Sequence, residues 1–218
     1  VLPPLPEQEI IATTLSNIDE LVNQLGKVIV KKKNIKQGTM QELLTGKRRL
    51  RGFDDKWNTR KLGKLADMSS GGTPLTHVNS YYGGKIPWVV IADMTNAGKY
   101  IINTEKNISK KGLENSSAKI FKTGTLFFAM YASIGKCCIS KIDLSCNQGI
   151  LGIETKDIDT EFLYYVMLYS KKHFLNMGQT GTQSNLNKGI VQNLDILYPS
   201  DKEEQNAIAQ ILSNMDLE

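Results

Sequence analysis

The chain has 218 residues, of which 40% are hydrophobic and 22% are charged, as in an ordinary soluble globular protein. This length allows one or two domains with packed cores. The sequence contains no run of eighteen apolar residues and no basic stretch followed by an apolar one, so it predicts neither a membrane span nor a secretory signal. Three cysteines are too few for a disulfide framework, so we expect buried thiols in a reducing cytosol.

The net charge of +5 is unevenly distributed along the chain. Residues 27–64 contain 13 Lys or Arg and 3 Asp or Glu, whereas the remaining residues contain 14 and 19. Such a cluster attracts a polyanion, and DNA is the usual one for a cytosolic protein. The alternative is a solvated helix face. The candidate phosphate contacts in this region are Lys31, Lys32, Lys33, Lys47, Arg48, Arg49 and Arg51.

Apolar residues near the start of the chain recur at alternating steps of four and three. This set consists of Ile11, Leu15, Ile18, Val22, Leu25 and Ile29. Residues so spaced lie along one side of a helix, which is typical of a coiled-coil seam that pairs with another helix. We expect a helix from about Glu7 to Lys36, a break or kink at Gly38, and a short helix over Met40–Leu44. Because Lys32 and Lys36 occupy the next seam positions, tight pairing should fade there.

The end of the chain repeats the start of this helix. Residues 204–216 align with residues 7–19 at an offset of 197, and eight of the thirteen aligned residues are identical. Unrelated stretches would match at about one position. The repeat predicts that the chain begins and ends in copies of one helical element, with a globular insert between them. The second copy is then a candidate partner for the seam.

The insert contains short apolar runs separated by Gly, Asn and Ser. These runs predict strands over Ile86–Ile91, Thr125–Tyr131, Lys136–Ser140, Gly149–Glu154 and Asp195–Leu197. A helix is predicted over Thr160–Met177, capped by Asp159 or Thr160, and a shorter one over Ser109–Asn115. Because strands and helices do not alternate strictly, the predicted fold class is α+β, a globular domain attached to a long coiled-coil-type helix. The predicted organisation is a long helix (1–46), a linker (47–56), a globular domain (57–199) and the start of a second helix (200–218).

The motifs of common catalytic sites are absent from the sequence. His77 and His173 have no partners at metal-ligand spacing, and no phosphate-binding glycine loop follows a predicted strand. Asp143, Glu154 and Lys156 could imitate the acid-acid-lysine set of a nuclease, but scattered matches of this kind are frequent by chance. We therefore expect no catalytic residue, no metal and no cofactor.

Short motifs occur in a fixed order along nearly the whole chain. The helical segments carry Pro-Pro-Leu-Pro-Glu-Gln at 3–8, Ile-Ala-x-x-Leu-Ser-x-Ile-Asp at 11–19, Lys-Gln-Gly at 36–38 and Leu-Leu-Thr-Gly at 43–46. The insert carries Gly52-Phe53, Trp57, Leu62-Gly63, Gly72-Thr73-Pro74, Ile86-Pro87-Trp88, Gly124-Thr125-Leu126, Ile134-Gly135-Lys136, Asn147-Gln148 and Thr180-Gly181-Thr182-Gln183. In these motifs the chain resembles the specificity subunit of bacterial type I restriction-modification enzymes.

The resemblance implies a DNA-recognition subunit without catalytic activity, in the cytoplasm of a bacterium or archaeon. In that family two target-recognition domains are joined by two long helices that pair antiparallel, and each domain reads one half of a split double-stranded DNA sequence. The helices set the spacer and dock methyltransferase subunits, which in turn carry restriction subunits. This chain looks like half a subunit, either a fragment or a half-length form that dimerises through the long helix. The alternative is a coiled-coil scaffold whose insert binds protein.

Within the insert, polar and basic residues of these motifs are the candidate DNA contacts. They are Thr73, Lys85, Lys136, Thr182, Gln183, Asn185 and Lys188. Gln and Asn can pair bidentately with adenine, and Lys suits phosphates. Each motif also has a structural interpretation: a turn at Gly72–Pro74, a plain hairpin at Gly135-Lys136, and a loop at residues 180–188 that pins itself to the core.

Overall fold

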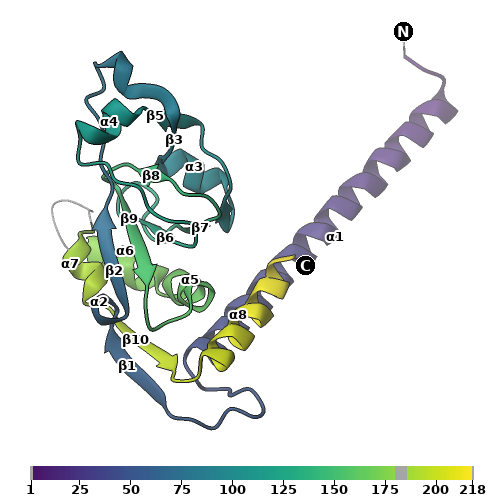
Figure 1. The fold of residues 1–218 in the computed structure, drawn as a ribbon. Coiled ribbons are helices and arrows are strands. Elements are labelled where there is room, and N and C mark those ends of the chain that lie inside the picture. The colour runs from purple at the N-terminus through teal and green to yellow at the C-terminus, as the bar shows by residue number, and fades with distance from the viewer. Residues whose placement is uncertain (1, 180–185, 218) are drawn as a thin grey trace.

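The first helix, α1 (Leu5–Leu44), is continuous and projects away from the rest of the chain (Figure 1). A computed structural model describes residues 2–179 and 186–217. At 40 residues, α1 is about 60 Å long. The predicted break at Gly38 is wrong. A glycine inside a helix costs about 1 kcal/mol, and the burial of Met40, Leu43 and Leu44 outweighs that cost at about 1.5–3 kcal/mol for each side chain. The helix ends before Gly46, whose φ is +67°.

The last helix, α8 (Lys202–Leu217), packs against α1, but not against the predicted seam. In Figure 1 it runs antiparallel beside the last part of α1, where Lys36 pairs with Asp216. The expectation that pairing fades at Lys36 is therefore wrong for this chain, because Lys36 marks the place where the contact with α8 is found. The seam residues lie nearer the N-terminus and are 45–61% exposed.

A five-stranded sheet forms the centre of the domain. Its strand order is β2 (Ala66–Ser70), β9 (Ile150–Thr155), β6 (Leu126–Ala129), β7 (Cys137–Ser140) and β4 (Tyr100–Ile101). All neighbours are antiparallel except β4 and β7. Along β6, Leu126 and Phe128 join one hydrophobic cluster, whereas Phe127 and Ala129 join another. Because both faces are covered, this strand has an unbroken apolar sequence instead of an alternating one.

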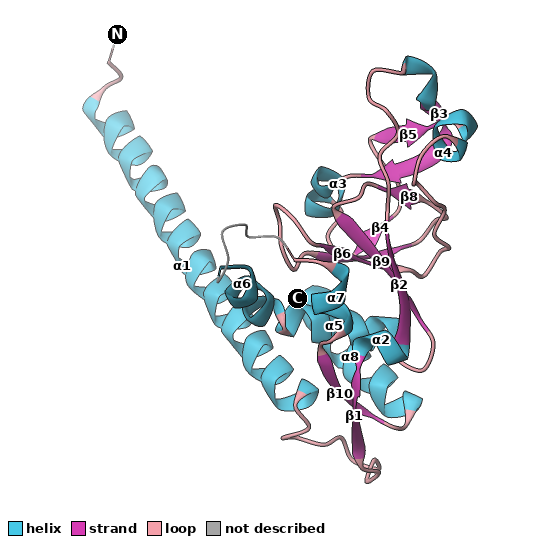
Figure 2. Ribbon diagram, turned by 90° about the vertical axis from the view of Figure 1, so that its left-hand side faces the viewer, coloured by secondary structure: helices cyan, strands magenta, loops and turns pink. Residues whose placement is uncertain are grey.

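Two smaller sheets lie at opposite ends of the domain (Figure 2). Near the end of α1, β1 (Trp57–Lys61) pairs antiparallel with β10 (Asp195–Pro199) and so joins the two ends of the insert. At the far end, β3 (Tyr82–Val89) lies between β5 (Lys106–Ile108) and β8 (Ser145–Cys146). The predicted strands at Ile86, Thr125, Lys136, Gly149 and Asp195 all have counterparts, with shifted ends.

The predicted helix over Thr160–Met177 is instead two helices, α5 (Thr160–Tyr169) and α6 (Lys171–Gln179). Asp159 caps α5 by accepting a hydrogen bond from the Phe162 N–H at 2.7 Å. The chain turns at Ser170, and Phe174 of α6 then packs on Phe128 of β6, with ring centroids 4.9 Å apart. The short elements are α2 (Leu62–Leu65), η1 (Asn79–Tyr81), α3 (Ile91–Asn96), α4 (Lys110–Glu114) and α7 (Lys188–Gln192).

The α+β fold predicted from the sequence is confirmed by this arrangement of mixed sheets and helices. Among residues 2–179 and 186–217, no helix has both the length and the apolar character needed to cross a membrane.

Candidate nucleic-acid interface

Several sequence motifs that are far apart in the chain meet at one edge of the five-stranded sheet. At this edge β2 ends, β6 ends and β9 begins, since Ser70 pairs with Leu151 and Ala129 pairs with Ile150. The segments that leave these strand ends are residues 71–74, 130–136 and 147–149. Polar groups on the three segments therefore lie close together, although up to 78 positions separate them in the sequence.

The segment after β2 lies directly on the segment before β9. The Gly72 N–H donates to the Cys146 carbonyl at 2.9 Å, and any Cβ at Gly71 or Gly72 would overlap neighbouring backbone. The indole of Trp88 donates to the Gly72 carbonyl at 3.0 Å. This close approach holds Thr73 against Gln148, and the Thr73 hydroxyl is hydrogen-bonded to the Gln148 Oε1. Gln148 is otherwise exposed.

The loop between β6 and β7 forms the neighbouring part of this edge. Its Ala132 has a φ of +54° and is the one residue other than glycine with a positive φ among those that the structure describes. Such a conformation costs of order 1–3 kcal/mol, and it is more frequent at binding sites than elsewhere. The Met130 N–H donates to the Gly149 carbonyl at 2.9 Å, and Tyr131 beside it is 36% exposed. The loop therefore places an aromatic ring against Gly149, the residue after Gln148.

Basic side chains surround this edge. Lys136 closes the loop, and Lys171 lies against Gly135. Burial raises the pKa of the Cys137 thiol, while Lys136 and Lys171 partly oppose that rise, so both ammonium groups lie near the start of β7. The Leu186 N–H donates to the Met130 carbonyl at 3.3 Å, which brings the segment leading to Lys188 to the same edge. Thr182, Gln183 and Asn185 lie outside the described residues.

Lys85 lies apart from this edge, exposed on β3 at the far end of the domain. A cavity of about 610 Å³ opens there, lined by residues that include Asn79, Tyr82, Trp88 and Lys106. The rings of Tyr82 and Trp88 meet edge to face, with centroids 5.9 Å apart. Lys85 is not among the lining residues, so the cavity is a separate surface feature.

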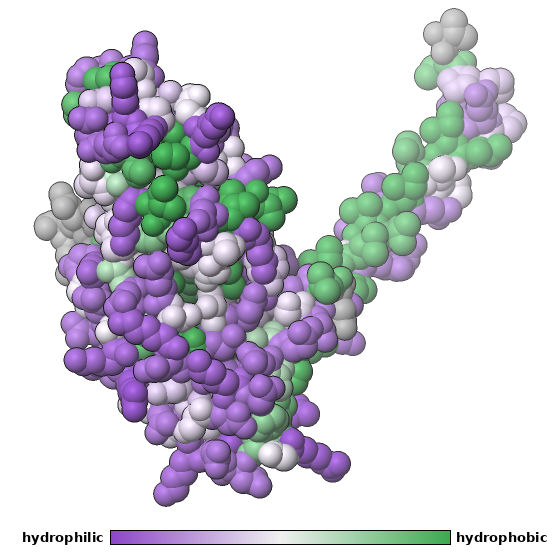
Figure 3. All heavy atoms as spheres, in the orientation of Figure 1, coloured by the Kyte–Doolittle hydropathy of each residue, from purple (hydrophilic) through white to green (hydrophobic). Residues whose placement is uncertain are grey.

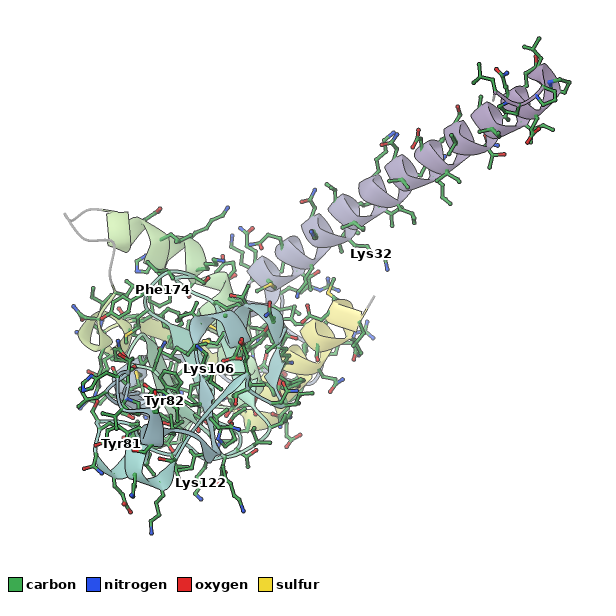
Figure 4. All side chains as sticks on the ribbon, turned by 90° about the horizontal axis from the view of Figure 1, so that it is seen from above. Lys32, Tyr81, Tyr82, Lys106, Lys122 and Phe174 are labelled. Carbon is green, nitrogen blue, oxygen red and sulfur yellow. The ribbon has the colours of Figure 1, made fainter. Side chains whose placement is uncertain are left out.

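The basic residues of the first helix and the linker lie on another side of the molecule. Figure 4 shows Lys32 on α1, well separated from Lys106 and Lys122 in the domain. Lys31, Lys32, Lys33, Lys47, Arg48 and Arg51 are all exposed. Arg48 lies 3.5 Å from a carboxylate oxygen of Glu42. These residues form a basic surface around the junction of helix and domain, not a continuation of the sheet edge.

Arg49 is half-buried, and its guanidinium is bound to a buried carboxylate. It donates two hydrogen bonds, of 2.8 and 2.9 Å, to the two carboxylate oxygens of Glu204, which is fully buried. The indole of Trp57 donates to the same carboxylate at 3.2 Å. We therefore assign Arg49 to the attachment of α8 and no longer include it among the phosphate contacts.

Two of the three residues of the nuclease alternative, Asp143 and Lys156, form ion pairs with side chains outside that set. Lys122 donates to Asp143 at 2.8 Å and holds the pKa of that carboxyl below its usual value. Lys156 pairs with Asp67 at 2.6 Å, and Glu154 lies in β9 opposite that residue. In residues 2–179 and 186–217, no group of three or more His, Cys, Asp or Glu side chains could hold a metal ion.

The three cysteines are buried and unpaired, as the sequence predicted. Burial raises the pKa of Cys138 to about 11 and that of Cys146 to about 12, so both are neutral thiols at physiological pH. Asp93 accepts hydrogen bonds from the N–H groups of Val90 and Glu105.

Sequence reasoning did not select two residues that the structure places at the sheet edge. Gln148 belonged to a motif, but nothing in the sequence connected it with Thr73. Lys171 lies in a region where the sequence predicted one continuous helix, so nothing marked it as a site residue. The strand register places Gln148 beside the loop ending at Lys136, and the contact of α6 with Gly135 places Lys171 there.

Solved structures with the same fold come from specificity subunits of type I restriction-modification systems. The HsdS subunit from Thermoanaerobacter tengcongensis aligns with a TM-score of 0.66 and 19% identity, over 99% of this chain and 52% of that one. The S subunit from M. genitalium aligns with a TM-score of 0.64 and 17% identity, over 98% and 55%. At these identities the comparison shows a common fold.

Sequence comparison adds the family. Residues 54–218 match the type I restriction modification DNA specificity domain, and the chain belongs to that family. The MjaIX specificity subunit of Methanocaldococcus jannaschii is 34% identical over 164 residues, which are 73% of this chain and 38% of that protein. The MjaVIII specificity subunit of the same organism is 26% identical over 99% of this chain and 54% of its own length. The chain thus spans roughly half, or less, of the relatives that it matches.

Proposed function

We propose that this chain reads one half of a bipartite double-stranded DNA target for a type I restriction-modification enzyme, and that it has no catalytic activity of its own. The observation that carries the proposal is the convergence of Thr73, Gln148 and Lys136 at one sheet edge, in a chain of the DNA specificity family. Amide side chains discriminate between bases, whereas ammonium groups hold phosphates without regard to sequence.

We infer that the roles of the basic residues follow from their positions. Lys136, Lys171 and Lys188 surround the edge, and they hold the phosphates on either side of the bases that are read. The exposed Lys and Arg residues of α1 and the linker contact more distant phosphates and set the orientation of the DNA along the helix. Gln183, Asn185 and Thr182 remain proposed base contacts, because the Leu186 N–H bond ties the segment that follows them to the same edge.

The seam of α1 is the proposed docking surface for methyltransferase subunits and, through them, restriction subunits. Its six apolar residues are 45–61% exposed, and they form a stripe that no described part of the chain covers. Figure 3 shows apolar residues continuing along the free part of α1. A stripe of this kind is typical of a protein interface. The same exposure also favours the alternative that the helix acts chiefly as a scaffold. A DNA-binding assay distinguishes this scaffold from the proposed DNA-recognition subunit.

Substitution of Gln148 tests the proposed reading of bases. After the target has been selected from random duplexes with the reconstituted complex, Gln148→Ala should weaken binding to the selected duplex by about 1–3 kcal/mol and binding to a scrambled duplex very little. Gln183→Ala should behave in the same way. Gln148→Glu keeps an oxygen for the Thr73 hydroxyl, but it loses the amide donor and adds a negative charge. It should therefore weaken binding to the selected duplex at least as much as Gln148→Ala, and it should weaken binding to the scrambled duplex as well. If Gln148→Ala leaves the preference intact in a folded domain, the edge does not read bases.

Substitution of single lysines tests the proposed phosphate contacts. Lys136→Ala and Lys32→Ala should each weaken binding to all duplexes alike and lower the slope of log affinity against log salt by about one. The measurement is a titration of selected and scrambled duplexes at several salt concentrations. The purified chain should neither cleave nor methylate either duplex. Cleavage with magnesium that Glu154→Ala abolishes would support the nuclease alternative instead.

A further inference from the structure

The cavity beside the rings of Tyr82 and Trp88 adjoins the sheet edge that carries the candidate base contacts. The Trp88 indole lines the cavity and donates to the Gly72 carbonyl at 3.0 Å. The Tyr82 hydroxyl donates to the Pro74 carbonyl at 2.7 Å, and burial raises the pKa of this hydroxyl, so it remains a donor at physiological pH. The segment that carries Thr73 is therefore bound to two walls of the cavity.

An irregularity in β3 shapes the cavity. Tyr82 and Ile86 both pair with Ile108 of β5, so the residues between them leave the ladder as a bulge. In a regular strand the six steps from Tyr82 to Trp88 would span about 20 Å, whereas the two ring centroids are 5.9 Å apart. Gly83 in the bulge lines the cavity with a φ of +72°, which other residues rarely adopt. Bulges are frequent next to active sites, where they redirect a side chain.

Polar groups with unused hydrogen-bonding capacity line the same cavity. Among the described residues, no hydrogen bond or ion pair occupies the side-chain amide of Asn79 or the ammonium of Lys106. Asn107 accepts a hydrogen bond from Thr104 at 3.3 Å through its side-chain oxygen, which leaves its amide nitrogen unused. Figure 4 shows Lys106 near Tyr82 on the domain. A cavity of about 610 Å³ with aromatic walls and a few polar groups is typical of a small-ligand site.

The lining groups match the features of a nucleotide. An aromatic ring stacks on a base whatever the identity of that base. The Asn amides suit the edge of a base, and the Glu105 carboxylate of the lining accepts from an exocyclic amino group. The Lys106 ammonium suits the phosphate. Because both faces of a base are covered inside a duplex, a nucleotide that stacks on a protein ring must lie outside the stack.

We propose that this cavity binds one nucleotide whose base lies outside a duplex stack, with the base against Tyr82 and the phosphate at Lys106. The favoured source is a nucleotide of the bound DNA, because Trp88 contacts the segment of the sheet edge as well as the cavity. A free mononucleotide has the same chemistry, and the experiment separates the two sources. The inference goes beyond the proposed reading of bases, because neither Gln148 nor the target sequence takes part in it.

A comparison of two duplexes tests the DNA source. One contains a single deoxyadenosine opposite an abasic site, and the other has the same scrambled sequence fully paired. Fluorescence anisotropy with the full chain should show about tenfold tighter binding of the first, as expected for one base that stacks on an aromatic ring. Tyr82→Leu should abolish this advantage. Tyr82→Phe is the matched control, because it keeps the ring and loses only the hydroxyl bond to Pro74, so the advantage should remain.

Free deoxyadenosine monophosphate tests the other source. Tryptophan fluorescence detects its binding, because Trp88 lines the cavity, whereas Trp57, the only other tryptophan, lies on β1 near the end of α1. Deoxyribose phosphate lacks the base and should produce no change. Binding of the mononucleotide that Tyr82→Leu removes, without any advantage of the unpaired duplex, would support the cavity as a nucleotide site and assign it to free nucleotides.

Lys106 gives a second variant that leaves the aromatic walls intact. Lys106→Gln should reduce the advantage of the unpaired duplex about threefold. Lys110→Gln is its control, because Lys110 is exposed at the same end of the domain and does not line the cavity. If folded Tyr82→Leu and Lys106→Gln chains bind both duplexes and the mononucleotide as the original chain does, the proposal is overturned. Gln148→Ala should leave the advantage unchanged, so this site and the proposed reading of bases succeed or fail separately.

Discussion

The two parts of α1 differ in what covers them, although both carry apolar residues at helical spacing. Met40, Leu43 and Leu44 are 3–5% exposed and pack against the domain, whereas the seam residues are 45–61% exposed. The difference teaches that apolar periodicity identifies a helix face that needs a partner but does not identify the partner. Near Lys36 the helix passes from a part that a domain of the same chain covers to a part that no described residue covers.

The two parts also differ in the kind of contact that they offer. The covered end combines the packing of buried apolar side chains with an ion pair between Lys36 and Asp216 of α8, which is directional. The seam offers only apolar side chains, which fit many partner helices. The first kind of contact fixes one geometry, and the second allows assembly with separate subunits.

The largest effect on stability should come from Glu204 of α8, the helix that packs beside the covered part of α1. Glu204→Ala leaves the Arg49 guanidinium and the Trp57 indole without their shared acceptor, so we expect a loss of about 3 kcal/mol in the free energy of unfolding. Urea denaturation followed by circular dichroism measures it. Glu203→Ala removes an exposed carboxylate from the same helix turn and should cost less than about 0.5 kcal/mol. Equal effects of the two substitutions would show that the buried pair does not hold α8.

Substitutions in the free part of α1 should change the self-association of the chain and not its stability. Ile18→Lys with Leu25→Lys should weaken self-association by a hundredfold or more and leave the unfolding of the monomer unchanged, because both side chains are exposed. Sedimentation at micromolar concentration measures the first effect. Asn17→Lys with Gln24→Lys adds the same charge beside the seam and should have little influence. A wild-type chain that sediments as a monomer would show that the seam pairs only with other proteins.

The sequence correctly predicted those elements that depend on local residues alone. The β6 run at Leu126–Ala129, the Asp159 cap of α5 and the long helix follow from local pattern and propensity. The sequence-based predictions were wrong where tertiary packing determines the local structure. Gly38 stays helical because Met40, Leu43 and Leu44 are buried, and the chain turns at Ser170 where Phe174 packs on Phe128.

The candidate site was predicted only in part, for a related reason. Thr73 and Lys136 could be selected as polar residues in glycine-containing turns. Their neighbours Gln148 and Lys171 become visible only through strand register and through the start of α6. The partner of Arg49 could not be predicted either, because Glu204 is 155 positions away and looks like any other acidic residue of a first helical turn.

The smallest expected loss of stability is at Lys36, where the covered part of α1 meets the free part. Comparing this loss with that at a neighbouring residue shows where the covered part ends. Lys36→Ala removes the ion pair with Asp216, whose partners are 23% and 33% exposed, so we expect a loss of up to about 1 kcal/mol in the free energy of unfolding. The Asp216 carboxylate keeps the Tyr165 hydroxyl as a donor, which limits the loss. Lys33→Ala, one turn earlier and exposed, should change the free energy of unfolding by less than about 0.5 kcal/mol. If Lys33→Ala costs as much as Lys36→Ala, the covered part of α1 extends further toward the seam than Lys36.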